Sequence, residues 1–119
     1  MKSRVNYLTV AQQYDLMHAC RAAEVAFREL GYGIFHVGSS VERPDWRDVD
    51  IRTMLENEVF DAWFKDAPHR LRFLNVCISE WLSARTGLPV DFQFQRQAEA
   101  NTEFRGRPRN FIAPPIEGA

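Results

Sequence analysis

One stretch of the sequence decides the fold: Gly38-Ser39-Ser40-Val41-Glu42-Arg43-Pro44-Asp45-Trp46-Arg47-Asp48-Val49-Asp50-Ile51. A Gly-Ser turn follows one apolar run, and two carboxylates stand two residues apart at the head of a second apolar run. Because side chains alternate across a strand, we expect Asp48 and Asp50 on one face and Val49 on the other. Two carboxylates on one face repel, which favours a bound cation such as Mg²⁺.

Upstream of this stretch, the pattern predicts a long helix and a short strand. Thr9 followed by Gln12 forms a capping box, and the helical pattern continues to about Leu30. After a glycine break, residues 34–37 are expected to form a strand that leads into the Gly-Ser turn. We expect His36, inside this strand, to be a packed or hydrogen-bonded residue and not a ligand.

Downstream, the apolar spacing predicts a strand to Leu55, a short helix from about Glu56, a long helix over about 69–85 and a third strand over 89–94. Within the third strand, Asp91, Gln93 and Gln95 share one face by alternation. A carboxylate beside two amides suits a general base, and Asp91 is the candidate for that role.

Three features together resemble the signature of the DNA polymerase β-like nucleotidyltransferase superfamily, especially its small single-domain members. They are the Gly-Ser turn, the Asp-hydrophobic-Asp pair and the later strand that carries Asp91. The resemblance covers about residues 9–97. It implies an α/β fold, with a small mixed sheet of about three or four strands and helices packed on one face. The chain is expected to be a single domain over 1–119, with residues 98–119 as a C-terminal extension.

This resemblance also implies a chemistry, the Mg²⁺-dependent (or Mn²⁺-dependent) transfer of a nucleoside monophosphate from a nucleoside triphosphate to a hydroxyl group. The catalytic and metal-binding residues it implies are Asp48, Asp50 and Asp91. The acceptor stays open between a small molecule, an RNA end and a protein.

The resemblance assigns the bound nucleotide to Gly38, Ser39, Ser40 and Arg47. A glycine lets the backbone approach a phosphate closely, and the serine hydroxyl and neighbouring N–H groups can bind its oxygens. Family members usually carry a small hydroxyl residue where this chain has Arg47. That arginine could pair with Asp48 and weaken metal binding, or it could hold the triphosphate.

Two other classes of function fit the same residues. A catalytically inactive module could bind nucleotide or RNA without turnover, and an antitoxin-like protein of the same fold could act through a partner protein. A homo-oligomer is also compatible with the sequence.

Composition sets the remaining bounds. The 119 residues carry a net charge of −1 and are 45% hydrophobic, which is typical of one globular domain and gives no general attraction to nucleic acid. Cys20 and Cys77 both fall in helical patterns and are expected to pack as small apolar residues. No signal-peptide pattern or membrane-length apolar run is present, so the expected location is the cytoplasm.

The C-terminal extension places Arg105, Arg107 and Arg109 at alternate positions. An extended segment would put their guanidinium groups on one side, a shape suited to phosphates or an RNA backbone. A tail packed over the domain through Phe104 and Phe111 fits equally well.

Overall fold

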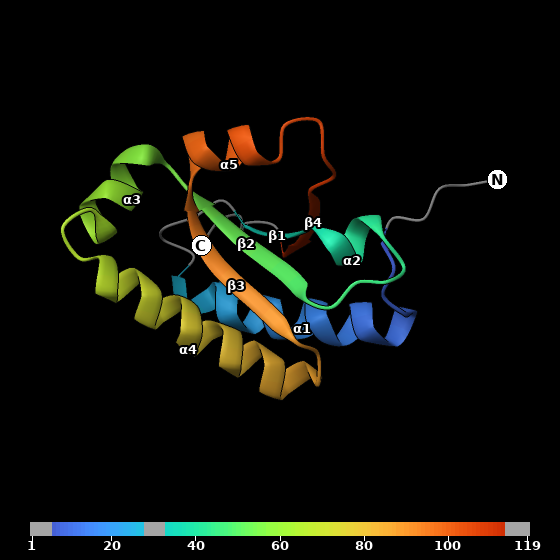
Figure 1. The fold of residues 1–119 in the computed structure, drawn as a ribbon. Helices are drawn as coiled ribbons and strands as arrows, with labels where there is room; N and C mark the ends of the chain where they lie inside the picture. The colour runs from blue at the N-terminus through green and yellow to red at the C-terminus, as the bar shows by residue number, and fades with distance from the viewer. Residues whose placement is uncertain (1–5, 28–32, 114–119) are drawn as a thin grey trace.

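A computed structural model describes residues 6–27 and 33–113, and its centre is a four-stranded mixed sheet (Figure 1). The strands are β1 (Ile34–Val37), β2 (Val49–Leu55), β3 (Val90–Arg96) and β4 (Asn110–Ala113). They lie in the order β3-β2-β1-β4. The β2–β3 pair is parallel, while β1 is antiparallel to both β2 and β4.

Among the described residues, five helices accompany the sheet: α1 (Val10–Phe27), α2 (Ser39–Glu42), α3 (Asn57–Phe64), α4 (Pro68–Thr86) and α5 (Gln97–Glu103). The two long helices, α1 and α4, lie side by side against one face (Figure 1). The predicted α/β class, with a small mixed sheet and helices on one face, is therefore confirmed. The sequence pattern did not reveal α5, which covers part of the opposite face.

Local signals explain where the long helices begin and end. The capping box before α1 is formed: the Thr9 N–H donates to Gln12 Oε1 (2.8 Å), and the Gln12 N–H donates to Thr9 Oγ1 (3.1 Å). The predicted end near Leu30 lies outside the described residues. Helix α4 begins at Pro68, one residue earlier than predicted, because the fixed φ of proline suits the first turn.

The main core lies between the sheet and the long helices. Val49, Ile51 and Phe92 are buried there and belong to one cluster with residues of α1 and α4. The other face carries a smaller cluster under α5, formed by Val37, Met54, Ala100 and Phe104. Alternation along β2 therefore sends one set of side chains to the main core and leaves the other for the second face.

The two cysteines differ in their surroundings. Cys20 is completely buried in the main core, as predicted, and burial raises the pKa of its thiol to about 12. Cys77 is exposed on α4, so the prediction that it packs in the core was wrong. A residue within a helical pattern can lie on either side of the helix, so the pattern alone does not show whether its side chain faces the sheet.

Strand β3 is an edge strand, and α4 supplies hydrogen-bond partners along that edge. The N–H groups of Val90, Phe92 and Phe94 donate to Ser83 Oγ (3.0 Å), Ser79 Oγ (2.8 Å) and Asn75 Oδ1 (3.0 Å). Two strand residues span about 6.6 Å and four helical residues span about 6 Å. The spacing of the helix side chains therefore matches the spacing of the strand N–H groups. Polar side chains on one helix face thus satisfy the N–H groups that an open edge would expose.

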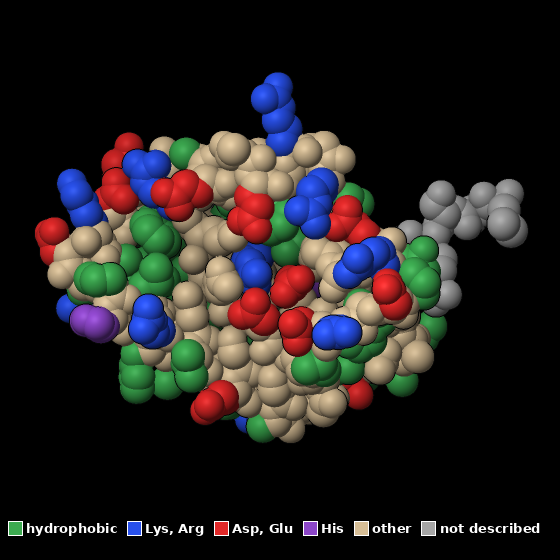
Figure 2. Space-filling model, in the orientation of Figure 1, with side chains coloured by type: hydrophobic (Ala, Val, Ile, Leu, Met, Phe, Trp, Pro, Cys, Tyr) green, Lys and Arg blue, Asp and Glu red, His purple; other side chains and the backbone are tan. Residues whose placement is uncertain are grey.

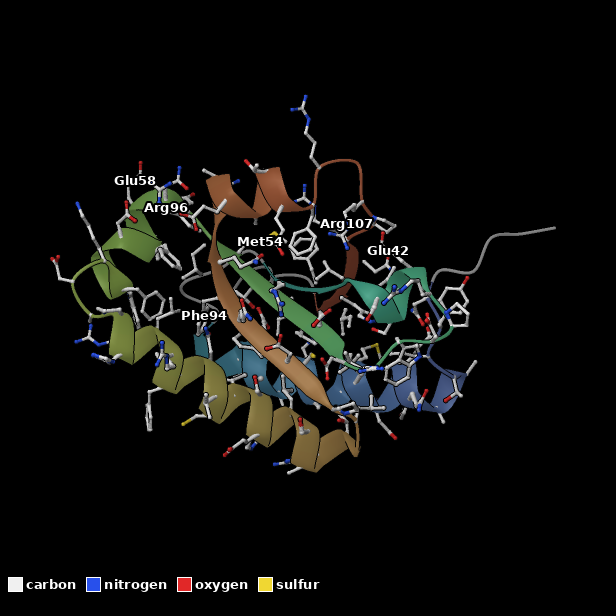
Figure 3. All side chains as sticks on the ribbon, viewed as in Figure 1. Glu42, Met54, Glu58, Phe94, Arg96 and Arg107 are labelled. Atoms are coloured by element: carbon white, nitrogen blue, oxygen red, sulfur yellow. The ribbon has the colours of Figure 1, made fainter. Side chains whose placement is uncertain are left out.

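Residues assigned by sequence to a C-terminal extension form part of this architecture. Strand β4 pairs with β1, and α5 packs on β2 and β3. The loop between them is fixed to α2, where Arg107 Nη2 contacts Glu42 Oε2 at 2.7 Å (Figure 3). Arg109 Nη1 donates to Asn101 Oδ1 (2.9 Å). Two of the three alternating arginines therefore bind groups of the protein itself.

Within the described ranges, no helix combines the length and apolar character needed to cross a membrane.

Candidate functional site

The Gly-Ser turn lies directly against a carboxylate of the Asp-x-Asp pair. Strand β1 ends at Val37, the backbone turns at Gly38 with φ 77°, and α2 begins at Ser39. A Cβ atom on Gly38 would overlap the Asp50 carboxylate, with Oδ2 as its nearest atom. A glycine is thus required here by both the backbone conformation and the close approach of Asp50.

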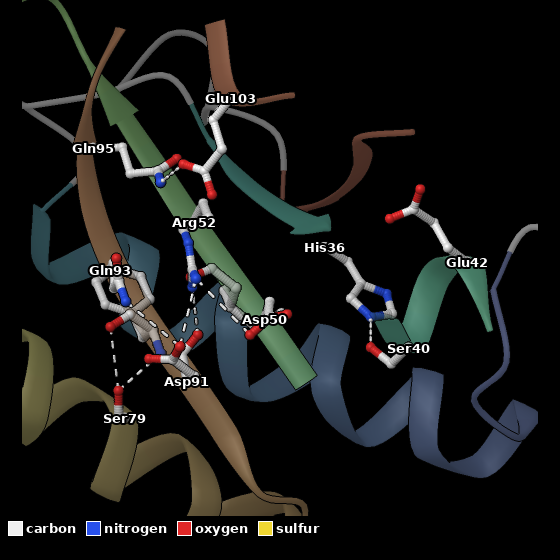
Figure 4. Close-up of polar contacts among 12 residues, drawn as sticks. His36, Ser40, Glu42, Asp50, Arg52, Ser79, Asp91, Gln93, Gln95 and Glu103 are labelled. Atoms are coloured by element: carbon white, nitrogen blue, oxygen red, sulfur yellow. Dashed lines mark hydrogen bonds and ion pairs between the residues drawn. The ribbon is translucent and has the colours of Figure 1, made fainter. Parts of the chain in front are cut away.

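Asp50 and Asp91 occupy paired positions on the parallel strands β2 and β3. Paired residues of neighbouring strands point to the same face, and Figure 4 shows both carboxylates on the side of the sheet away from the long helices. The structure therefore brings together two acidic residues that are far apart in the sequence. The Asp50 side chain is 22% exposed and that of Asp91 is 46% exposed.

Asp48 is exposed and lies just before β2, in the connection that follows α2. Its charge acts on Asp50. Burial is the main cause that raises the pKa of Asp50, and Arg52 opposes this effect; the negative charges of Asp91, Asp48 and Glu103 raise the pKa further. The site thus combines partial burial with several negative charges, a setting in which a cation stabilises the ionised form.

Arg52 is the main member of the site that sequence reasoning missed. Its guanidinium lies between the two paired carboxylates, with Nη2 at 3.4 Å from Asp91 Oδ2 and 3.8 Å from Asp50 Oδ1 (Figure 4). Nη1 donates to the main-chain oxygens of Ile51 (3.0 Å) and Asp91 (2.7 Å). A signal was present in the sequence, because Asp48, Asp50 and Arg52 alternate and so share one strand face.

Further acidic side chains surround this centre. Figure 2 shows carboxylates gathered around basic groups in the middle of the visible face. Glu103 approaches from α5 and accepts a hydrogen bond from Gln95 Nε2 (2.9 Å). Glu42 of α2 contacts Arg107, and its hydrogen bond is the main cause that raises the pKa of that arginine. These two carboxylates are therefore already paired with groups of the protein.

The residues assigned to nucleotide binding occupy different environments. Ser39 is half-buried at the start of α2, and Arg47 is exposed before Asp48. Ser40 is fully buried, and its Oγ lies 2.5 Å from His36 Nε2. Its hydroxyl is therefore engaged inside the protein. The prediction that His36 is a packed, hydrogen-bonded residue is confirmed; burial lowers its pKa to about 4, so the ring is neutral near pH 7.

The donor chemistry fits Mg²⁺ or Mn²⁺, because carboxylate oxygens are the ligands that these hard cations prefer. As the side chains lie, no group of three His, Cys, Asp or Glu in the part of the chain that the structure describes is arranged to hold a metal ion. The positive charge of Arg52 lies within 4 Å of both Asp50 and Asp91. The residues that would hold such a cation are Asp48, Asp50 and Asp91.

A groove of about 580 Å³ adjoins the site. It runs between α4 and β3, and Asp91 and Gln93 form part of its wall together with Ser79 and Arg72. The groove thus leads from the carboxylates along the edge of the sheet.

Comparison with models of known protein families, with curated proteins and with solved structures found no match to this chain.

Proposed function

We propose that the protein catalyses divalent-metal-dependent transfer of a nucleoside monophosphate from a nucleoside triphosphate to a hydroxyl acceptor. The observation that carries the proposal is the juxtaposition of the Gly38 turn with Asp50, and of Asp50 with Asp91 on the adjoining strand. This is the arrangement that the sequence resemblance implies for a nucleotidyl transfer site.

Each residue has a defined part in this proposal. Asp48, Asp50 and Asp91 would hold the divalent cation, which when bound would neutralise charge on the triphosphate and on the leaving pyrophosphate. The main chain at Gly38 lies against the Asp50 carboxylate and so borders the proposed site of the nucleotide. Asp91 is more exposed than Asp50, with which it is paired, and it lies at the groove. It is therefore positioned to accept the proton of an attacking hydroxyl.

The acceptor would enter along the groove between α4 and β3. Its wall combines apolar side chains such as Leu71 and Val76 with the polar groups of Asn75 and Gln93. A wall of this kind can hold an acceptor that has both apolar and hydrogen-bonding parts.

The test is incubation with each labelled nucleoside triphosphate and Mg²⁺ or Mn²⁺, alone and with total cellular RNA. We expect label on an acceptor, and a loss of at least about a hundredfold in the variants Asp50→Asn and Asp91→Asn. The control is Asp66→Asn, an exposed carboxylate on the turn after α3. Transfer that persists in both site variants would contradict the proposal, and so would the same loss in the control.

The contacts of Arg52 favour a second candidate, a module that binds nucleotide without turnover. A guanidinium between the paired carboxylates neutralises them without a metal. This candidate predicts that a nucleotide raises the melting temperature equally with and without Mg²⁺, and that no pyrophosphate is released. A melting shift that requires the metal would exclude it.

A further inference from the structure

We infer that the outer side of α4 is a surface for self-association, on which two copies of the chain pack their α4 helices antiparallel about a twofold axis. The inference does not depend on the proposed function, because it uses none of the carboxylates on β2 and β3. It begins from three large apolar side chains of α4 that lie at the surface: Phe73 is 67% exposed, Val76 49% and Trp81 36%. Figure 2 shows hydrophobic side chains gathered at the surface over the first half of α4.

Together with the exposed Cys77 and Ala84, these three side chains form a continuous stripe along the helix, here called the α4 stripe. Its members are neighbours because residues three and four positions apart meet on a helix surface. The other side of α4 already packs on the main core, through residues that include Leu74 and Leu82. A surface helix normally carries polar residues on the side away from the core. A second apolar side at the surface therefore indicates a contact with another molecule.

Charged residues of α4 favour an antiparallel arrangement of two such helices. Glu80 is the only charged residue over positions 73–84, and Arg72 precedes it by about two turns; both are exposed. In a parallel pair, Glu80 would face Glu80 of the other copy, and like charges repel. In an antiparallel pair centred between Val76 and Cys77, Glu80 of each copy lies near Arg72 of the other.

A second copy of the chain fits this surface because the surface is complementary to itself. The twofold arrangement packs one α4 stripe on the other and forms the contact between Arg72 and Glu80 twice. The net charge of −1 causes little repulsion between copies. One face of a 19-residue helix is smaller than the roughly 800 Å² that each partner contributes to a standard stable interface. We therefore expect a reversible dimer with a dissociation constant on the order of micromolar.

Sedimentation velocity over a wide range of protein concentration tests for this dimer. The sedimentation coefficient should rise with concentration, and Val76→Glu should weaken the dimer at least about tenfold, because it places a charge in the α4 stripe. The matched control is Val25→Glu on α1. Val25 is 50% exposed, so the same substitution at equal exposure should leave the dimer unchanged.

A charge exchange tests the antiparallel orientation. Glu80→Lys would bring two positive charges together and should weaken the dimer at least about threefold. Arg72→Glu combined with Glu80→Lys exchanges the two charges and should restore the affinity of the unaltered protein.

Cys77 provides a test of the twofold axis, which passes beside it. The chain contains only two cysteines, and Cys20 is completely buried, so a short bismaleimide should react at Cys77. We expect a covalent dimer in the unaltered protein and in Val25→Glu. Val76→Glu should give much less of it, and Cys77→Ser none.

A protein that stays monomeric to several hundred micromolar, with no covalent dimer, would overturn the inference and leave the α4 stripe to a different protein. A dimer that Val76→Glu and Val25→Glu weaken equally would overturn it as well. Failure of the exchanged pair to restore affinity would exclude the antiparallel arrangement, and species larger than a dimer would exclude the twofold axis. Circular dichroism checks that each variant is folded.

Discussion

At the scale of single residues, His36 links burial to the pH dependence of stability. Its pKa falls from an ordinary 6.5 to about 4 because burial disfavours the charged ring. Between these two values the unfolded chain binds a proton that the folded chain does not. The free energy of unfolding should therefore fall as the pH drops from about 6.5 to about 4, by up to about 1.4 kcal/mol per pH unit from this residue.

Urea unfolding of the protein and of His36→Gln at pH 7 and pH 5 measures this contribution. The unaltered protein should lose more stability than the variant over that interval, since other titrating groups are common to both. His69→Gln, which replaces an exposed histidine, should behave like the unaltered protein. Equal losses in the protein and in His36→Gln would show that His36 is protonated in the folded state.

Gly38 gives a second prediction at this scale. Its φ of 77° and ψ of −153° lie in a region that only glycine adopts readily, and an added Cβ would overlap the Asp50 carboxylate. We expect Gly38→Ala to lower the free energy of unfolding by more than about 2 kcal/mol. Gly87→Ala is the matched control: its φ is 71°, but nothing lies within 4 Å of its added Cβ, so the loss should be about 1 kcal/mol. Equal losses in urea unfolding would contradict the contact with Asp50.

The sequence predicted some of the site residues and missed others for a physical reason. Strand alternation and the resemblance together pointed to Asp50 and Asp91. Alternation assigns each of these residues to a face of its own strand, and this needs no knowledge of the neighbouring strands. Arg52 obeys the same alternation, but its role depends on what lies across the sheet. The pairing of Asp50 with Asp91 is a tertiary contact, and the guanidinium between them follows from it.

At the scale of elements, side chains of α4 accept hydrogen bonds from N–H groups of β3. Removal of one such acceptor should expose the corresponding β3 amide to hydrogen exchange. Ser79→Ala removes the hydroxyl that accepts the Phe92 N–H (2.8 Å). An N–H left without its partner costs about 1–3 kcal/mol, so the Phe92 amide should exchange its hydrogen faster and the protein should lose about that much stability. Hydrogen exchange by NMR and urea unfolding measure the two effects.

The control for this variant is Thr102→Ala. The Thr102 hydroxyl donates to the carbonyl of Ala98 within its own helix and is exposed, so its loss should change stability by less than about 0.5 kcal/mol. Unchanged exchange at Phe92 in Ser79→Ala would mean that water or another group satisfies the N–H equally well.

Element prediction from sequence succeeded where each helix or strand carries its own signals. The capping box of α1 and the Pro68 and Gly87 boundaries of α4 mark their ends within a few residues. Helix α5 gave no such signal, because Ala100 is its only buried residue among those described and the rest of its residues are polar or exposed. Helix α2 is a single turn, too short for a helical period to show.

At the scale of the whole molecule, the C-terminal segment is a part of the sheet. Strand β4 forms the second edge through its pairing with β1, and Ile112 packs on the main core. Neither contact was evident from sequence, because a four-residue strand after a glycine- and proline-containing loop has no repeat long enough to mark it. The alternating arginines fitted either a polyanion-binding arm or a tail packed over the domain through Phe104. Phe104 is buried in the cluster under α5, and Arg107 and Arg109 bind α2 and α5.

The place of the C-terminal segment in the sheet predicts the effect of its removal. A chain shortened to end at Arg109 lacks β4, so β1 loses its antiparallel partner and the core loses Ile112. We expect its melting temperature, followed by circular dichroism, to fall by more than about 10 °C, because a loss of about 2 kcal/mol or more lowers the melting temperature of a domain of this size by that order. Arg105→Ala keeps the strand and removes one exposed arginine of the alternating set, so its melting temperature should change by less than about 2 °C. The opposite result, a stable shortened chain and a destabilised Arg105→Ala, would mean that the segment stabilises the protein through its charge and not through its place in the sheet.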